Sequence, residues 1–559
     1  MKGKTGLKLT MVKDVFRPLV AVVISLAALS AVADPATQNP ERLTSQLGIL
    51  TPPVAKAPRI NGPRVYGVRP GRPILYRVPV TGEKVEVGLE GLEGLGGLEF
   101  DPKTRVLSGA IAKKGEYRLR IVAKNEFGTD EKPFTIKVGD KIALTPPMGF
   151  NSWNYVGDHP SDAMMRKAAD AMIARGLADH GYQYVNVDDC WQQLNRANCP
   201  WRWKDGKKPE NPPPVVERDE TGRIIPQKAF PDMKALADYI HAKGLKCGLY
   251  SSPGDYTCAG ATGSWKHEYR DAGTWAEWGF DYVKYDLCSY SFKKMAYGPS
   301  QRMKAMIPYL LMGKALREQK RDIVLSICQY GLDDVPVWGE RAYGQCWRTT
   351  GDVWDNWEKV RAAIARQEDN WYYSGPGAWN DPDMLVVKST VKTTSLTPNE
   401  QYTHISMWAM VAAPLMIGCD MAALDDFTLA LLTNDEVIDI DQDELGKGAA
   451  FIARCDGAEV WARPLADGSA ALAFFNAGDA ERELAFALKD LGLEGRWAFR
   501  DVWRQRDIGV VEGRWTTTIP GHATTLVRVR PSGGHYREGL DDIRDLSWLR
   551  YVAERRPVK

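Results

Sequence analysis

Several widespread motifs are missing from this 559-residue sequence, and each absence argues against a class of function. The chain has only seven histidines and contains neither HExxH nor GxSxG, so a zinc protease and a serine hydrolase lose their main support. No CxxC pair occurs, which argues against a structural zinc site and a thioredoxin-like motif. The glycines between residues 88 and 97 do not complete GxGxxG, so no dinucleotide site is indicated. We therefore expect neither a metal ion nor an organic cofactor.

An excess of one charge is also missing. The 73 Lys and Arg residues nearly balance the 71 Asp and Glu residues, and the formal net charge is +2. This balance gives no field that would select a phosphate backbone, which argues against a dedicated nucleic-acid binder. Hydrophobic residues make up 44% and charged residues 26%, which is ordinary for globular proteins and excludes wholesale disorder. At roughly 100–200 residues per domain, the length predicts about three folded units.

The apolar run near the start of the chain, residues 19–29, is shorter than the ~20 residues that a membrane-spanning helix needs. Lysines precede this run and three small residues follow it, as in a secretory signal peptide cleaved after Ala33. An uncleaved anchor is the alternative, which the length disfavours. No cysteine precedes Cys190, so a lipid-modified cysteine at the cleavage site is excluded. We predict a secreted or periplasmic protein without a membrane span, whose nine cysteines could form disulfides.

The residue pattern changes three times after this segment. Short β-rich runs alternate with turn residues before residue 141 and again after residue 447, which predicts a β-sandwich at each place. The first of them resembles an immunoglobulin-like module. The predicted parts are a signal peptide at 1–33, a linker at 34–58, an immunoglobulin-like β-sandwich at 59–141, a (β/α)8 barrel at 142–446, an antiparallel β-sandwich at 447–531 and a polar tail at 532–559.

The central region repeats one unit, in which an amphipathic helix and a glycine precede a short apolar strand that ends in a polar residue. The helix predicted over 162–179, for example, leads through Gly181 to a strand over 184–189. Strands that alternate with helices pair in parallel through right-handed crossovers. Eight such strands begin near residues 148, 184, 245, 281, 323, 346, 377 and 414. Eight units in about 300 residues predict a (β/α)8 barrel, whose active site lies at the C-terminal ends of the strands.

Acidic residues follow several of these strand ends. They are Asp188, Asp189, Asp286, Asp352, Asp381 and Asp383. Any one of them alone has a simpler explanation, because Asp is a common helix N-cap directly after a strand. Together with Trp153, Tyr250 and Trp379 they would form a polar cup with aromatic walls. Such a cup suits glycoside hydrolysis, which uses two catalytic carboxylates.

Five segments carry more specific motifs. They are PMGFNSW at 147–153, VDDCW at 187–191, KYDLC at 284–288, WNDPDML at 379–385 and the segment 434–446. Together they resemble glycoside hydrolase family 27, which contains the α-galactosidases and the α-N-acetylgalactosaminidases. Motifs in the right order across some 300 residues are stronger evidence than any one of them. The resemblance covers about residues 144–530 and implies a retaining exo-glycosidase that acts on a carbohydrate.

The resemblance makes Asp286 the nucleophile and Asp352 the acid/base. A retaining mechanism needs the two carboxyl groups ~5–5.5 Å apart, one ionised to attack the anomeric carbon and one protonated to release the aglycone. We expect the neighbouring Lys284 to favour the ionised form of Asp286. Asp381 is a tempting alternative, but the resemblance assigns sugar hydroxyls to Asp383 and a structural role to Asp381.

The resemblance also implies which residues hold the sugar. Asp188 and Asp189 bind the hydroxyls far from the scissile bond, and Trp153 stacks on the sugar ring. The other members of the cup are Tyr250, Lys284, Arg348, Asp383 and Met384. Because a cation close to the acid/base would oppose its protonation, we expect Arg348 to bind a sugar hydroxyl instead.

Cysteine positions fit the same family. The resemblance implies two disulfides that close loops around the site, Cys258 with Cys288 and Cys328 with Cys346. Each could contribute about 3 kcal/mol if its geometry is unstrained. The family's usual disulfide partner of Cys190 would follow Trp153, where this sequence has no cysteine. We therefore expect Cys190 to pair with Cys199 instead. The remaining cysteines are expected to be buried free thiols: Cys247, Cys419 and Cys455.

Three departures from the family bear on the substrate. Where α-galactosidases usually carry Glu after the strand-5 cysteine, in the loop that selects the group at sugar C2, this sequence has Gln329. Gln can donate to or accept from a hydroxyl, so we expect Gln329 to bind a galactose hydroxyl rather than an N-acetyl group. Retention of both Asp188 and Asp189 favours a sugar with a C6 hydroxyl over arabinopyranose. The other departures are an insertion at 192–228, which could wall the site, and the N-terminal module.

We predict a secreted α-galactosidase that removes terminal α-D-galactosyl residues. Other specificities of the family stay open: β-L-arabinopyranosidase, α-N-acetylgalactosaminidase and isomaltose-releasing dextranase. A carbohydrate-binding protein that has lost catalysis on the same barrel is the alternative from a different class. The presence of both Asp286 and Asp352 favours an enzyme, because a binding protein needs neither. The aglycone and the oligomeric state are not predicted.

Overall fold

The computed structural model describes residues 48–199, 206–208, 210, 214–290, 300–387, 394–455 and 457–536. The predicted signal peptide, most of the linker and the tail beyond residue 536 lie outside the described residues. No helix in the described part of the chain has the length and apolar character that a membrane crossing requires.

Eight parallel strands form the central sheet. They are β10 (Met148–Asn151), β11 (Tyr184–Asn186), β12 (Lys246–Ser251), β13 (Tyr282–Tyr285), β14 (Val324–Ile327), β15 (Cys346–Arg348), β16 (Trp379–Asp381) and β17 (Leu415–Ile417). Neighbours in the chain are neighbours in the sheet, and β17 returns to pair with β10. A parallel bridge between Leu385 and Ile417 closes the remaining seam between the end of β16 and β17. The barrel prediction is confirmed, and each observed strand begins within two residues of its predicted start.

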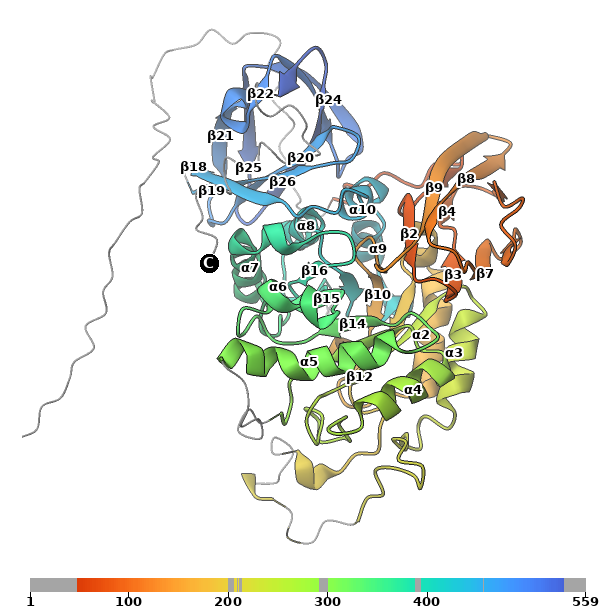
Figure 1. The fold of residues 1–559 in the computed structure, drawn as a ribbon. Helices are drawn as coiled ribbons and strands as arrows, with labels where there is room; N and C mark the ends of the chain where they lie inside the picture. Colours follow the sequence, from red (N-terminus) through yellow and green to blue (C-terminus); the bar gives the residue numbers. More distant parts are fainter. Residues whose placement is uncertain are drawn as a thin grey trace, which may run out of the picture. The chain divides into compact units, whose positions relative to one another are not determined.

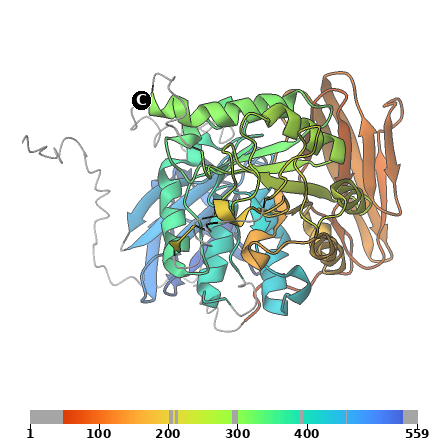
Figure 2. The same ribbon diagram turned by 90° about the horizontal axis from the view of Figure 1, so that it is seen from below.

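Helices alternate with these strands, and the longer ones lie around the outside of the barrel (Figures 1 and 2). They are α1 (Trp153–Val156), α2 (Asp162–Ala174), α3 (Met233–His241), α4 (Glu268–Trp278), α5 (Gln301–Arg317), α6 (Val335–Trp338), α7 (Trp357–Arg366), α8 (Pro398–Met410), α9 (Asp426–Leu432) and α10 (Asp435–Asp441). Several begin at a side chain that accepts a hydrogen bond from the first turn, as Ser161 does for α2 and Asn356 does for α7. At α8, Thr397 and Glu400 form a complete capping box.

One predicted helix is shorter than expected. The helix predicted over 162–179 ends at Ala174, because Gly176 adopts a left-handed conformation with φ of 75°. A short 3-10 turn, Leu177–His180, follows and leads to Gly181 before β11. Asp179 belongs to this 3-10 turn and contacts the N-terminal region, because its carbonyl accepts from Asn61 and its carboxylate from Arg77.

The C-terminal region contains a six-stranded sheet in the order β18-β19-β20-β26-β23-β24 and two further strand pairs, β21 with β25 and β22 with β27. The strands are β18 (Ala450–Cys455), β19 (Ala458–Pro464), β20 (Ala470–Asn476), β21 (Arg482–Ala487), β22 (Leu493–Glu494), β23 (Arg496–Asp501), β24 (Arg506–Glu512), β25 (Arg514–Ile519), β26 (Thr524–Pro531) and β27 (His535–Tyr536). The β-sandwich prediction is confirmed, although β27 extends the fold past the predicted end at residue 531.

Helix α8 lies between the barrel and the C-terminal sheet. Its residues from Glu400 to Met410 are buried, and one hydrophobic cluster runs from the barrel strands to Trp461 and Trp503 of the C-terminal region. Hydrogen bonds join the two parts as well, since Trp503 Nε1 donates to Ser406 Oγ at 2.8 Å. The barrel and the C-terminal region therefore share one hydrophobic cluster, and the C-terminal strands enclose a second cluster of their own.

The N-terminal region contains a four-stranded sheet in the order β2-β9-β8-β5 and a three-stranded sheet in the order β3-β7-β6. The strands are β1 (Arg59–Ile60), β2 (Val65–Val68), β3 (Pro73–Arg77), β4 (Val80–Thr81), β5 (Glu86–Glu90), β6 (Leu98–Asp101), β7 (Val106–Ala110), β8 (Gly115–Asn125) and β9 (Gly128–Val138). Side chains of both sheets form a core of their own, which includes Tyr76 and Phe134. The immunoglobulin-like assignment stays a prediction.

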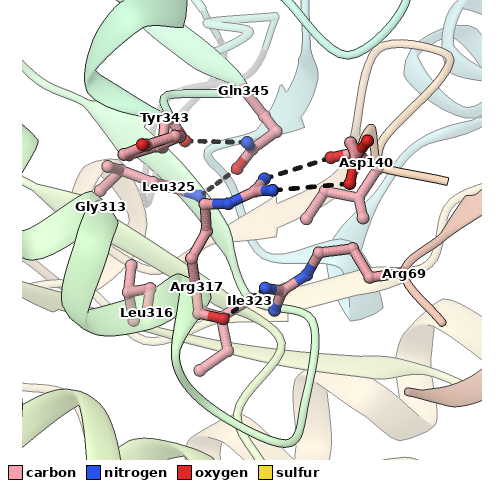
Figure 3. Close-up of a pocket in the computed structure, with 10 residues that line it drawn as sticks. Arg69, Asp140, Gly313, Leu316, Arg317, Ile323, Leu325, Tyr343 and Gln345 are labelled. Atoms are coloured by element: carbon pink, nitrogen blue, oxygen red, sulfur yellow. Dashed lines mark hydrogen bonds and ion pairs between the residues drawn. The ribbon is translucent and has the colours of Figure 1, made fainter. Parts of the chain in front are cut away.

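Arg69, in the loop between β2 and β3, joins the N-terminal region to the barrel (Figure 3). Its main-chain N–H donates to Asp322 at 2.8 Å, and its guanidinium pairs with the same carboxylate and donates to the carbonyl of Arg317. Arg317 is the last residue of α5, and Asp322 precedes β14. The N-terminal region therefore contacts the end of the barrel where the strands begin, opposite the end where a barrel active site lies.

Candidate active site

One pocket opens at the C-terminal ends of the barrel strands, with an empty volume of about 440 Å³ that includes its open mouth. Its walls combine acidic, basic and aromatic side chains. The lining residues are Trp153, Asn154, Asp188, Asp189, Tyr250, Cys258, Lys284, Asp286, Tyr330, Arg348, Asp352, Trp354, Asp383 and Met384. Both predicted catalytic residues are among them, as are all the predicted substrate-binding residues except Gln329.

Asp286, directly after β13, is buried and held on both carboxylate oxygens. Tyr250 donates to Oδ2 at 2.9 Å, and Tyr330 donates to Oδ1 at 2.6 Å. The main-chain N–H of Leu287 also donates to Oδ1, at 2.7 Å. Burial raises the pKa of Asp286 above its ordinary value, while Lys284 and these hydrogen bonds act in the opposite direction. The predicted effect of Lys284 is therefore present, but desolvation outweighs it.

The inner end of the pocket contains an ion pair between Lys284 and Asp188. Lys284 Nζ donates to Asp188 Oδ2 at 2.8 Å, and Asn151 donates to the same oxygen at 2.8 Å. Burial acts to lower the pKa of Lys284, but the charges of Asp188 and Asp286 outweigh it and raise this pKa. Lys284 is therefore a fixed cation between two carboxylates.

Asp189 is buried beside this pair. Its Oδ1 accepts from the main-chain N–H of Cys190 at 2.7 Å, and its Oδ2 accepts from that of Ala259 at 2.8 Å. Burial raises the pKa of Asp189 to about 7, and these hydrogen bonds oppose the shift. The loop between β12 and α4, which contains Ala259, thus fixes the orientation of this carboxyl group.

Arg348, the last residue of β15, bridges two acidic residues. Its Nη2 lies 3.3 Å from Asp352 Oδ1, and its Nη1 lies 3.0 Å from Asp383 Oδ1. Arg348 thus lies against both carboxylates and also lines the pocket, and its predicted bond to a sugar hydroxyl stays a prediction. Burial raises the pKa of Asp383 to about 6, with Arg348 opposing the shift. Asp352 differs from the other acids of the pocket, because its side chain is 48% exposed.

Asp383 has an unusual backbone conformation, with φ of 92°. Such a conformation is strained in a residue with a side chain and is common at functional sites. Its surroundings hold it in place, because its Oδ2 accepts from the N–H of Val353 at 2.7 Å and its carbonyl accepts from Trp408 at 2.8 Å. Asp381 accepts from the N–H of Asp383 at 2.8 Å and lines a smaller cavity beneath the pocket. This geometry is compatible with the structural role predicted for Asp381.

Two predicted side chains face elsewhere. Gln329 is fully buried, does not line the pocket and donates to Asp333 at 3.2 Å. The next residue, Tyr330, lines the pocket in its place, from a left-handed conformation with φ of 56°, and the substrate-binding role of Gln329 stays a prediction. Trp379, predicted as an aromatic wall, is also fully buried, and its indole N–H donates to the carbonyl of Ala143.

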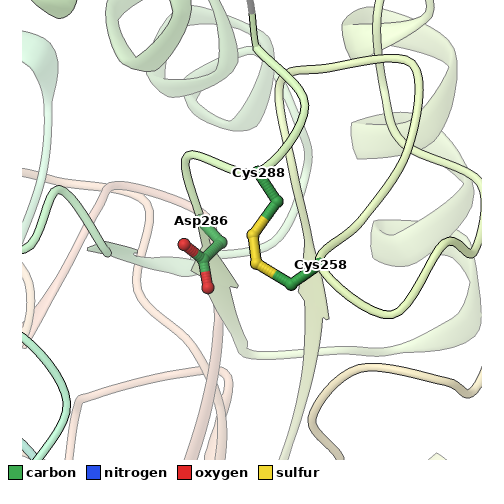
Figure 4. Close-up of side chains that lie close together, drawn as sticks. All are labelled: Cys258, Asp286 and Cys288. Carbon is green, nitrogen blue, oxygen red and sulfur yellow. A yellow bond between two sulfur atoms is a disulfide. The ribbon is translucent and has the colours of Figure 1, made fainter. Parts of the chain in front are cut away.

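The structure confirms the disulfide between Cys258 and Cys288, which lies beside Asp286 (Figure 4). These three residues are close enough together to suggest a metal site, but both sulfurs are committed to the disulfide and only one ligand remains. The disulfide connects the residue before Ala259 to the second residue after Asp286. One covalent bond therefore joins the loop that holds Asp189 to the strand end that presents Asp286.

The second predicted disulfide is absent, since Cys328 and Cys346 are both free and buried. In the register of the sheet, Cys346 lies opposite Ser326 rather than Cys328. Two residues along a strand correspond to about 7 Å, so the two thiols occupy different layers of the barrel interior. Cys190 is also free, so it does not pair with Cys199. The expectation of a buried free thiol is confirmed for Cys247.

Comparison with known proteins agrees with this site. A family model described as "Alpha galactosidase A" matches residues 214–443, and one described as "Alpha galactosidase C-terminal beta sandwich domain" matches residues 455–529. The alpha-galactosidase of Cyamopsis tetragonoloba is 40% identical over 395 residues, which cover 70% of this chain and 87% of that protein. The chain belongs to glycoside hydrolase family 27, the family of the α-galactosidases. It is a glycoside hydrolase of the α-galactosidase type.

Other family members match a similar share of the chain, and they include an enzyme of a different activity. Alpha-galactosidase A of Cellvibrio japonicus is 35% identical over 417 residues, which cover 70% of this chain and 93% of that protein. The crystal structure of alpha-galactosidase I from Mortierella vinacea has a TM-score of 0.61 and 28% identity, and the match covers 70% of this chain and 98% of that one. A family 27 β-L-arabinopyranosidase from Geobacillus stearothermophilus is similar to the same extent, with a TM-score of 0.60, 27% identity, and coverage of 70% of this chain and 97% of that one.

A crystal structure from Bacteroides fragilis resembles more of the chain. It has a TM-score of 0.76 and 34% identity, and the match covers 85% of this chain and 98% of that one. Residues 142–536 make up only about 71% of the chain, so this similarity extends into the N-terminal region. The N-terminal region is therefore shared with at least one other protein of this fold.

Proposed function

We propose that this family 27 hydrolase removes terminal α-D-galactosyl residues with retention of configuration. Asp286 attacks the anomeric carbon while Asp352 protonates the departing oxygen, and Asp352 then activates the water that releases galactose. The observation that supports this most strongly is that the two carboxylates line one pocket, the first buried and hydrogen-bonded, the second partly exposed.

The surroundings of Asp286 favour the role of nucleophile. Tyr250, Tyr330 and the main-chain N–H of Leu287 direct hydrogen bonds at its oxygens and fix their orientation. Lys284 favours its ionised form, which burial alone would disfavour. A nucleophile held in one orientation loses little entropy when it attacks, so more of the binding energy lowers the barrier.

The shape of the pocket favours exo action. Asp188 and Asp189, each 1% exposed, form its inner end together with Lys284, so a sugar chain cannot continue past them. Asp352 lies at the open end, where the aglycone leaves and water enters. Tyr330 belongs to the loop that the family resemblance assigns to sugar C2, and its ring leaves less room there for an N-acetyl group.

Hydrolysis of nitrophenyl glycosides tests the substrate. We expect the purified protein to release nitrophenol from the α-galactoside faster than from the β-L-arabinopyranoside, and NMR to detect α-galactose as the first anomer. Faster release from the arabinoside would indicate a β-L-arabinopyranosidase of the same family. No release from any glycoside between pH 4 and pH 8, with the fold intact, would contradict the proposal.

Two alanine variants separate the catalytic roles. Asp286→Ala should abolish turnover of every substrate, by about 10⁴-fold or more, because no covalent intermediate can form. Asp352→Ala should cost about 10²–10⁴-fold on substrates with a poor leaving group and much less on dinitrophenyl galactoside, whose leaving group needs no proton. Asp381→Asn is the control and should mainly reduce thermal stability. Equal losses on both substrates in Asp352→Ala would contradict the assignment of Asp352.

We also propose that the protein is exported and that residues 1–33 are removed. The disulfide between Cys258 and Cys288 supports an oxidising compartment, because disulfides are rare in reducing cytoplasm. Sequencing the N-terminus of the protein isolated from its natural source should find Asp34 first. An N-terminus at Met1 would contradict this processing.

A further inference from the structure

We propose that the indole of Trp354 is the platform on which the leaving sugar binds, so that the enzyme favours substrates whose galactosyl group is attached to another pyranose. This inference rests on the proposed function, because it uses Asp352 to locate the leaving group.

The pocket has a direction, which the exposure of its lining residues defines. The inner end contains Asp188 and Asp189, which are almost inaccessible. At the outer end, the side chain of Asp352 is 48% exposed and Trp354 is 54% exposed. A terminal sugar enters inner end first, so the group attached to it projects past Asp352 into the mouth.

The acid/base determines where the bond to the leaving group lies. A general acid must come within hydrogen-bond reach of the atom that it protonates, here the glycosidic oxygen next to Asp352. Trp354 follows two residues later in a segment without helical structure, and it lines the same pocket. Val353 between them is 3% exposed and packs into the barrel core, so residues 352 and 354 face the pocket together.

Trp354 is exposed to an unusual degree for its type. Among the tryptophans in the described ranges, it is the one that is exposed, whereas eleven others are buried. Isolated exposed apolar residues are common and need no explanation. Trp354 differs because it lines a pocket of polar and charged groups, where an uncovered aromatic ring provides a flat face for the apolar side of a sugar.

The main chain around Trp354 is held on both sides. The main-chain N–H of Val353 donates to Asp383 at 2.7 Å, and the main-chain carbonyl of Asp355 accepts from the hydroxyl of Ser395 at 2.5 Å. Asn356 then caps α7 with its side chain. A platform that is fixed before the ligand arrives costs less entropy to organise.

The test compares two substrates with the same galactosyl group. Melibiose has a glucopyranose as leaving group, whereas methyl α-galactoside has a leaving group too small to reach the indole. We expect Trp354→Ala to lower kcat/KM for melibiose about 10-fold more than kcat/KM for methyl galactoside, mostly through KM. Trp354→Phe should restore part of the difference, because a smaller ring still offers a flat face.

Phe127→Ala is the matched control, because Phe127 is 44% exposed and lies in the N-terminal region, away from the pocket. This variant should leave the ratio of kcat/KM for melibiose to kcat/KM for methyl α-galactoside unchanged. If Trp354→Ala lowers kcat/KM equally for melibiose and methyl α-galactoside, or for neither, the inference is overturned while the proposed function stays intact. A wild-type protein that hydrolyses neither galactoside would instead overturn the proposed function, and the inference with it.

Discussion

Tyr330 and Tyr250 each donate a hydrogen bond to a different carboxylate oxygen of Asp286. These bonds should affect the pH dependence of kcat/KM. The hydrogen bond from Tyr330 stabilises the ionised carboxylate and so lowers the pKa of Asp286 relative to burial alone. Tyr330→Phe should therefore move the acid limb of kcat/KM to higher pH. At pH values below that limb kcat/KM should fall by about 10- to 150-fold, because hydrogen bonds to charged groups contribute about 1.5–3 kcal/mol.

The pH profile of kcat/KM for nitrophenyl galactoside measures this shift. Tyr250→Phe should move the limb in the same direction, since it removes the bond to the other oxygen. Tyr239→Phe is the control, because this hydroxyl donates to Asp170 on the outside of the barrel. A Tyr330→Phe profile that is lower at every pH, without displacement of the limb, would mean that Tyr330 only fills space.

The buried carboxyl of Asp189 makes a second pH effect measurable, on stability. Burial raises the pKa of this carboxyl from its ordinary value of 3.8 to about 7. The protonated carboxyl therefore adds to the free energy of unfolding in full below about pH 4, and this stabilisation is lost as pH rises through 7. One such proton changes the free energy of unfolding by at most ~1.4 kcal/mol per pH unit. Asp189→Asn should flatten the fall in stability between these values.

Urea denaturation at a series of pH values measures that slope. The slope is the readout rather than the absolute stability, because the Asp189→Asn substitution also removes an acceptor for one main-chain N–H. Asp238→Asn, on the exposed side of α3, should keep the wild-type slope. If Asp189→Asn keeps it too, the raised pKa assigned to Asp189 is wrong.

The sequence could predict Asp188, Asp189 and Asp286 because acids that directly follow apolar strands must lie at one end of a parallel barrel. It could not predict Tyr330. Whether Gln329 or Tyr330 faces the pocket depends on the left-handed turn at Tyr330, and the pattern of apolar residues does not encode this turn. The glycine at position 331 is a partial sequence signal of this turn. Its φ is 73°, and the Cβ of any other residue there would lie 2.1 Å from the carbonyl oxygen of Thr349.

At the scale of elements, strand order was predictable from the repeated helix and strand pattern, whereas register was not. The expected disulfide between Cys328 and Cys346 failed on register alone, because the two residues lie on adjacent strands but in different layers. Contacts between regions far apart in the sequence, such as that of Arg69 with α5, leave no periodic signal either.

The contact of Arg69 with Asp322 can be tested directly. Both side chains are nearly buried, with exposures of 11% and 14%, so removing one partner leaves a charge without compensation. Arg69→Ala should lower the free energy of unfolding by about 2–4 kcal/mol. Lys114→Ala removes a pair of which both members are more than 60% exposed, and it should cost about 0.5 kcal/mol or less. Similar losses in the two variants, measured by urea denaturation, would contradict the anchoring role of Arg69.

At the scale of the whole molecule, the three regions are joined in two different ways. The barrel and the C-terminal sheet share one hydrophobic cluster, whereas the N-terminal region has its own core and makes several polar contacts with the barrel. Besides Arg69, these include Arg59 with Asp439 and Asn61 with the carbonyl of Asp179. Shared apolar burial couples unfolding more strongly than partly exposed ion pairs, which salt screens.

Hydrogen exchange in increasing urea should therefore find two units. Peptides from α8 and β20 should lose protection together, and peptides from β8 and β9 should lose it at a lower urea concentration in Arg69→Ala than in the wild type. High salt should likewise cause the peptides from β8 and β9 to lose protection at a lower urea concentration, relative to those from α8 and β20. Loss of protection in β20 well before α8 would show that the shared core does not couple them.

The bond between Cys258 and Cys288 gives the choice of expression host a direct effect on catalysis. Chains synthesised in a reducing cytoplasm would keep the barrel but lose the tether between the two walls that grip the glycone. Such preparations should contain full-length, well-folded material of low specific activity, and mild oxidation after purification should recover the missing turnover.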